Sequence, residues 1–213
     1  TWEGITCHAD GEFKGLVQKI ELEDNNLVGL AELVLIWRFE GLEFLNLQKN
    51  DISVPFINIE NAVNLHTLMI SETKTSSLMG IGGAQQLKEL HVTNAELFGE
   101  IPAELFDLTR LEKLYLSQNA LTGSLQTMVG QLRALKDLYL FDNNLRGTLP
   151  SEIGLLGSVE HLSLGKNDFV GIIPRQVGSL PRLEVLSLES EEDAGFDGMF
   201  SVGGGGLSGS LPA

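Results

Sequence analysis

Leucines alternate with polar residues in one short motif that returns along almost the whole chain. The segment Leu135–Pro150 reads LKDLYLFDNNLRGTLP, which has the form L-x-x-L-x-L-x-x-N-x-L-x-G-x-L-P. Two further copies begin at Leu111 and Val159, so the three copies start 24 residues apart. A fixed period of this length is typical of solenoids, in which each repeat is one structural unit.

Within each copy, the L-x-L core predicts a short strand. Because side chains alternate between the two faces of a strand, Leu138 and Leu140 should point inward, and Asp137, Tyr139 and Phe141 outward. One repeat alone leaves its leucines uncovered, so neighbouring repeats must stack on one another. Each buried leucine contributes about 1.5–3 kcal/mol, which over several repeats offsets the entropy of ordering the chain.

The asparagine of the motif follows the strand, where the chain must turn. A buried amide at Asn143 can bond the backbone groups that the turn leaves unpaired, which Asp or Ser does less completely. The connecting segments share an apolar position, which predicts a second inward ladder of Leu105, Val129, Ile153 and Val177.

This strand motif resembles that of leucine-rich repeat proteins, and its L-x-G-x-[IL]-P continuation is similar to the plant-type subclass of receptor ectodomains and secreted polygalacturonase-inhibitor-like proteins. The resemblance implies an α/β solenoid, a curved right-handed coil of about eight repeats of roughly 22–25 residues. A parallel β-sheet would form its concave face, and short helical or 3-10 turns its convex side. We expect a partial N-terminal cap over residues 1–16 and the solenoid over residues 17–213.

Two stretches depart from the motif. Thr73 and Ala95 replace the asparagine, so the coil should be less regular between residues 42 and 95 than beyond them. The last repeat resumes at Leu207, 14 residues later than the period predicts, with an acidic and glycine-rich insert at about 191–206. Such inserts form surface loops, which are either functional or structureless. If functional, the loop would contact a partner through Phe196, Met199 and Phe200.

The chain is acidic, with 14 basic and 29 acidic residues and a formal net charge of −15. This charge argues against nucleic acid or an anionic membrane as a partner. An alternative is that it only keeps an elongated protein soluble. No apolar run is long enough to cross a bilayer, so membrane attachment would need segments absent from this chain.

The single cysteine, Cys7, lies in the segment WEGITC. This segment resembles the end of the plant-type cap, C-x-W-x-G-V-T-C, which implies a disulfide to a cysteine just before Thr1 and therefore an oxidising compartment. A buried free thiol is the alternative. The chain has no N-x-S/T glycosylation sequon, which argues against an ordinary cell-surface receptor.

The sequence gives little support for catalysis. It has no nucleophile elbow and no His or Cys pair at metal-ligand spacing, and its four histidines fall in different repeats. We therefore expect no enzymatic activity, no cofactor and no metal site.

The outward positions of the strands predict a binding surface on the concave face. Strands lie about 4.8 Å apart, so His91, Tyr115, Tyr139 and Phe141 should form one aromatic patch, with Asp137 and His161 on its border. Grouped exposed aromatics are typical of binding hot spots. Equally, a cross-strand tyrosine pair stabilises a sheet without any ligand.

These features favour a non-catalytic module, extracellular or at the cell surface, that binds a protein, peptide or glycan through its concave face. One alternative is a structural accessory subunit of a large assembly. Its location would then be the lumen of an organelle or the complex itself. Another is a receptor ectodomain that continues beyond this chain. The oligomeric state and the identity of the ligand stay open.

Overall fold

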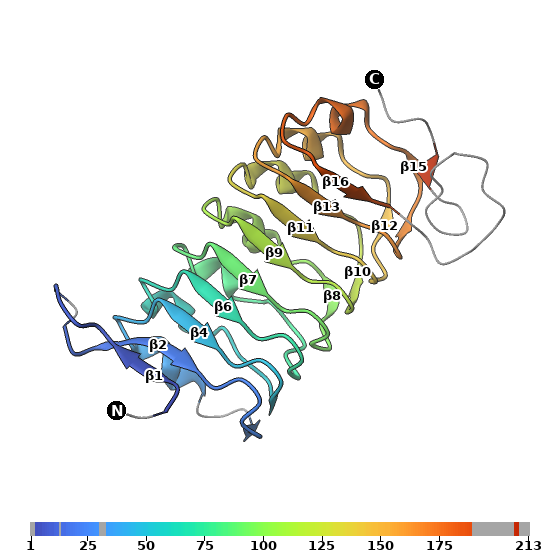
Figure 1. The fold of residues 1–213 in the computed structure, drawn as a ribbon. Coiled ribbons are helices and arrows are strands. Elements are labelled where there is room, and N and C mark those ends of the chain that lie inside the picture. The colour runs from blue at the N-terminus through green and yellow to red at the C-terminus, as the bar shows by residue number, and fades with distance from the viewer. Residues whose placement is uncertain (1–2, 13, 30–32, 189–206, 209–213) are drawn as a thin grey trace.

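The computed structural model of the chain describes residues 3–12, 14–29, 33–188 and 207–208. Its short strands stack in chain order into an elongated coil, from β1 and β2 at one end to β16 at the other (Figure 1). The main sheet runs along one side of the coil, and the 3-10 segments run along another (Figure 1). This is the leucine-rich repeat solenoid that the period predicts.

The main sheet has nine strands, in the order β1-β2-β4-β6-β7-β9-β11-β13-β16. β1 pairs antiparallel with β2, and the other neighbours pair parallel. The strands are β1 (Ile5–Cys7), β2 (Val17–Glu21), β4 (Phe44–Asn46), β6 (Thr67–Met69), β7 (Glu89–His91), β9 (Lys113–Tyr115), β11 (Asp137–Tyr139), β13 (His161–Ser163) and β16 (Val185–Ser187).

The alternation predicted for the strand around Leu138 is confirmed, whereas in β4 and β13 the outward residues Asn46 and Ser163 are buried as well. Leu138 and Leu140 are buried, whereas Asp137, Tyr139 and Phe141 are partly exposed. The parallel strands pair without a shift, so their central leucines form one ladder through the coil: Leu45, Leu68, Leu90, Leu114, Leu138 and Leu162. The solvent face of this sheet is the predicted concave face, and we call it the sheet face.

The returns between strands are 3-10 segments in the described residues. They are η1 (Leu33–Arg38), η2 (Ile59–Asn61), η3 (Ile81–Gly83), η4 (Ala103–Asp107), η5 (Thr127–Gln131), η6 (Ser151–Leu155) and η7 (Arg175–Ser179). Each is too short for an α-helix and closes with an i→i+3 bond, such as Leu132 N to Val129 O at 3.1 Å. The predicted second ladder is confirmed, because all four of its residues are buried.

Smaller strands form a second edge of the coil beside the main sheet. They pair as β3 (Val28–Gly29) with β5 (Asp51–Ile52), β8 (Phe98–Glu100) with β10 (Ala120–Thr122), β12 (Arg146–Gly147) with β14 (Asp168–Phe169), and β15 (Gly171–Ile172) with β17 (Leu207–Ser208). In the last pair Gly171 lies opposite Leu207, as Gly147 lies opposite Phe169 in β12 and β14. Leu207 therefore occupies the register position of the next repeat.

The motif asparagines form a ladder of buried and partly buried hydrogen bonds. Asn143 Oδ1 accepts from Leu121 N at 3.1 Å, and its Nδ2 donates to Leu116 O and Leu140 O, both at 3.0 Å. Each amide thus joins its own turn to the turn of the preceding repeat. The same arrangement occurs at Asn50, Asn119 and Asn167.

The ladder changes chemistry where the motif fails. Thr73 Oγ1 bonds Ile70 O at 2.8 Å and lies 2.9 Å from Thr75 Oγ1, which accepts from Val54 N at 3.1 Å. The two hydroxyls thus bond two backbone groups, where the Asn143 amide bonds three. Ala95, in the next repeat, has no polar side chain at this place. The prediction of a less regular coil between residues 42 and 95 stays a prediction, because the strands β4, β6 and β7 within it keep their register.

Candidate partner-binding face

A row of stacked rings crosses the middle of the sheet face. The His91 and Tyr115 rings have centroids 4.5 Å apart and planes tilted by 39°, and those of Tyr115 and Tyr139 lie 4.9 Å apart with a tilt of 38°. The spacing follows from the strand register, which places His91, Tyr115 and Tyr139 opposite one another. Because the rings pack against each other, the row presents mainly ring edges to solvent.

Phe141 does not join this row. On this face the ring contacts link the other three aromatics, whereas Phe141 lies under the Lys166 ammonium, with Nζ 5.3 Å from the ring centroid. Phe141 follows Tyr139 by two residues, which is about 7 Å along an extended chain. The expected patch of four rings is therefore a row of three with one ring beside it.

Asp137 joins two of the predicted site residues rather than lying at their border. Its Oδ2 accepts a hydrogen bond from Tyr115 Oη at 3.0 Å, and its Oδ1 accepts one from His161 Nδ1 at 2.6 Å. Only 13% of its side chain is exposed. Burial, followed by the bond to Asp137, raises the pKa of the Tyr115 hydroxyl, so this group stays a hydrogen-bond donor at neutral pH.

His91 ends the row on β7. Its Nε2 lies 3.5 Å from Glu89 Oε2, a long contact that does not meet hydrogen-bond geometry, and the buried nitrogen has no hydrogen-bond partner in the described chain. Burial is the main cause that lowers the pKa of the His91 imidazole, and the Lys113 ammonium adds to it, while Glu89 opposes it. The ring is therefore neutral at neutral pH.

This environment predicts a pH dependence of stability. The pKa of His91 is lower in the folded chain than its ordinary value of 6.5, so below that pH the unfolded chain binds the extra proton more readily. The free energy of unfolding should therefore fall as the pH drops from 7.5 to 5.5. Urea titrations across this range should show a smaller fall for His91→Gln than for the wild type. Equal slopes would contradict the prediction.

The remaining predicted contacts lie elsewhere. Phe196, Met199 and Phe200 fall outside the described residues, so their role in the insert stays a prediction. Cys7 is exposed with a free thiol, so the alternative of a buried thiol is wrong. A disulfide to a residue before Thr1 stays a prediction as well.

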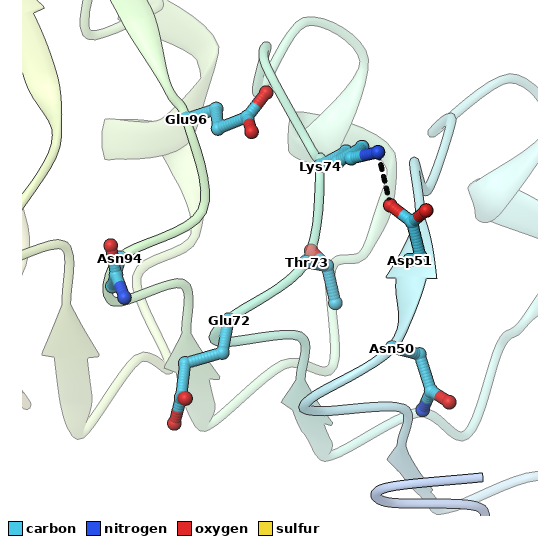
Figure 2. Close-up of a pocket in the computed structure, with 7 residues that line it drawn as sticks. All are labelled: Asn50, Asp51, Glu72, Thr73, Lys74, Asn94 and Glu96. Carbon is cyan, nitrogen blue, oxygen red and sulfur yellow. Dashed lines mark ion pairs between the residues drawn. The ribbon is translucent and has the colours of Figure 1, made fainter. Parts of the chain in front are cut away.

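An open pocket that the leucine motif does not predict lies beside the turns that carry Thr73 and Ala95. It measures about 380 Å³ and is lined by Asn50, Asp51, Glu72, Thr73, Lys74, Asn94 and Glu96. Figure 2 shows Lys74 pointing to Asp51, with which it forms an ion pair, while Glu72 and Glu96 extend from neighbouring turns. Since Asp51 engages the only cation, the pocket presents mainly acceptor groups. The sequence feature that marks this pocket is the loss of the motif asparagine at Thr73 and Ala95.

Metal binding and membrane insertion find no structural counterpart in the described ranges. No group of three or more His, Cys, Asp or Glu side chains there is placed to hold a metal ion. No helix within those ranges combines the length and the apolar character that crossing a membrane requires.

The comparisons with known proteins agree with the fold. The family described as Leucine rich repeat matches residues 85–145. No curated protein matches the chain. Among solved structures, the ectodomain of the Arabidopsis thaliana receptor kinase GASSHO1/SCHENGEN3, in complex with CASPARIAN STRIP INTEGRITY FACTOR 2, is 27% identical over 89% of this chain and 26% of its own, with a TM-score of 0.73.

Two further solved structures are similar. A TDR receptor is 31% identical over 79% of this chain and 30% of its own, with a TM-score of 0.73. The Arabidopsis receptor kinase HAESA, in complex with the peptide hormone IDA and a co-receptor, is 29% identical over 74% of this chain and 27% of its own, with a TM-score of 0.69. The chain thus spans only about a quarter to a third of the length of these proteins.

Proposed function

Because the chain is a leucine-rich repeat solenoid of the plant type, we propose that it is a non-catalytic module that binds a protein or peptide partner through its sheet face. The observation that carries the proposal is the row formed by His91, Tyr115 and Tyr139, which is held in place before any partner binds. Side chains fixed in this way lose little conformational entropy on binding, which favours affinity.

The known relatives support the class of partner. GASSHO1/SCHENGEN3 and HAESA were each solved as ectodomains or receptors with a bound factor or peptide hormone. By analogy, this chain acts outside the cell, as part of an ectodomain or as a secreted binder. An extracellular location also suits the expected disulfide of Cys7.

The test compares peptide binding by the wild type and by the triple variant Tyr115→Ala, Tyr139→Ala, Phe141→Ala. Peptides selected from a random display library on the wild type should bind the triple variant at least about tenfold more weakly, because hot-spot aromatics carry most of the binding energy. Affinity is measured by isothermal titration calorimetry, and circular dichroism checks that the fold persists.

The matched control is Phe98→Ala. Phe98 is 65% exposed on β8, away from the main sheet, so its removal should leave the affinity unchanged. Equal affinity of the wild type and of a folded triple variant would overturn the sheet face as the site.

A further inference from the structure

A basic cluster interrupts the acidic surface at the edge where β7 and β9 begin. Backbone hydrogen bonds stack the residues that precede the strands into one column, with Lys88 N bonded to His66 O at 2.8 Å, Glu112 N to Lys88 O at 2.7 Å and Lys136 N to Glu112 O at 2.8 Å. Arg110 precedes the same edge. We call Lys88, Arg110, Lys113 and Lys136 the basic edge.

The carboxylates within this edge are already engaged. Glu112 pairs with Lys136 at 2.6 Å, and Glu89 pairs with Lys113 at 3.1 Å. Neither Lys88 nor Arg110 forms an ion pair with a carboxylate of the described residues, and both side chains are exposed. Within the basic edge four cations thus face two carboxylates, which leaves an excess of two positive charges, although Lys88 also attracts the Glu112 carboxylate and helps to lower its pKa.

Arg110 lies beside the repeat that carries Lys88. Its Nη1 donates to Gln86 Oε1, in the repeat of Lys88 and two residues before it. The guanidinium thus crosses the repeat boundary and retains further N–H donors for a planar anion. Both charges act on His66, because its pKa is lowered first by burial and then by repulsion from Lys88, while Glu43 opposes this shift and Arg110 adds to it.

The basic edge and the aromatic row lie on the same strands. Lys88 and Arg110 precede β7 and β9, which carry His91 and Tyr115. Lys88 precedes His91 by three residues, or roughly 10 Å, and Arg110 precedes Tyr115 by five residues, or at most roughly 17 Å along an extended chain. The ring edges exposed by the row carry the positive end of the aromatic quadrupole, so both features favour acceptor groups.

We infer that the basic edge docks an acidic segment of the protein or peptide partner, with an Asp or Glu carboxylate bridging Lys88 and Arg110. This inference rests on the proposed function and names the chemistry of its partner. The net charge of −15 opposes an acidic partner over most of the surface. That repulsion is screened beyond about 8 Å at physiological salt, whereas the contact at the basic edge is direct. The acidic segment therefore has one place to dock, which fixes the orientation of the partner.

The test uses a fluorescein-labelled peptide of alternating Glu and Gly and a second peptide with Gln in place of each Glu. Fluorescence anisotropy is measured for the wild type, for the double variant Lys88→Gln, Arg110→Gln and for the control Arg146→Gln, Arg175→Gln. The two double variants change the net charge equally, but Arg146 lies on β12 and Arg175 on η7.

The Glu peptide should bind the wild type and the control alike, bind the basic-edge variant about tenfold more weakly, and outcompete the Gln peptide. Equal binding to both double variants, or no preference for Glu over Gln, would overturn the basic edge as a docking site. The sheet face is judged separately by the triple aromatic variant. If the triple aromatic variant loses binding while Lys88→Gln and Arg110→Gln have no effect, only the proposal of an acidic segment at the basic edge is refuted.

Discussion

Replacing Asn143 by alanine is expected to lower the free energy of unfolding by about 3 kcal/mol, because a buried backbone group left without a partner costs roughly 1–3 kcal/mol. The amide serves three such groups, Leu121 N, Leu116 O and Leu140 O. The side chain is only 7% exposed, so water does not replace it without opening the turn. Urea denaturation followed by far-UV circular dichroism measures the change.

The neighbouring residue provides a matched control. Asn144 is exposed, and its backbone N–H donates a hydrogen bond to Leu121 O at 2.8 Å. Asn144→Ala keeps that bond, so its midpoint should stay close to that of the wild type. If both alanine variants unfolded at the same urea concentration, the ladder would not be a main source of stability. Asn143→Asp should also destabilise the chain, since a carboxylate cannot donate to Leu116 O and Leu140 O.

The regular repeats are predictable because each structural requirement of the repeat is met by one residue type. A leucine such as Leu138 appears wherever two stacked strands leave an apolar space, and Asn143 appears wherever a turn leaves backbone groups unpaired. Both needs recur with the same period as the backbone. The sequence distinguishes less clearly whether the returns are 3-10 segments or α-helices. Leu33–Arg38 is apolar enough for either helix type, and only its length and spacing decide.

The side-chain contacts of the sheet face were only partly predictable. Strand register places Tyr139 opposite Tyr115, so their stacking follows from the sequence pattern. The bond between Tyr115 and Asp137 is diagonal and depends on side-chain rotamers, which the period does not determine. Lys166 occupies the turn position directly before the motif asparagine, where Gln118 and Asp142 also have positive φ, so the repeat determines the backbone there but not the rotamer that carries the ammonium over the Phe141 ring.

The net charge of the whole chain does not reveal the basic edge. A formal charge of −15 describes the whole chain, but charge acts over about one Debye length, so the local arrangement decides what each surface attracts. Lys88 and Arg110 are 22 residues apart in sequence, and only the stacking of repeats and the bond of Arg110 to Gln86 bring them to one edge. Polar positions outside the strand core therefore carry the functional information that the consensus leaves out.

Replacing Leu138 by alanine should lower the free energy of unfolding by about 3 kcal/mol, because truncating a buried leucine loses transfer free energy and leaves a cavity. Leu138 is 1% exposed and lies between Leu114 and Leu162 in the central ladder. In a solenoid each repeat contacts only its neighbours, so the loss should stay local. Hydrogen exchange should accelerate most in β9, β11 and β13 and least in β4 and β6.

Leu155→Ala is the control for this substitution. Leu155 is 51% exposed in η6, so the same truncation there removes little buried surface and should barely change the unfolding midpoint. The pattern of exchange then separates two modes of unfolding. Uniform acceleration from β2 to β16 in Leu138→Ala would mean that the coil unfolds as one cooperative unit. Acceleration confined to the neighbouring strands would mean that the sheet face can lose its aromatic row while the rest of the coil stays folded.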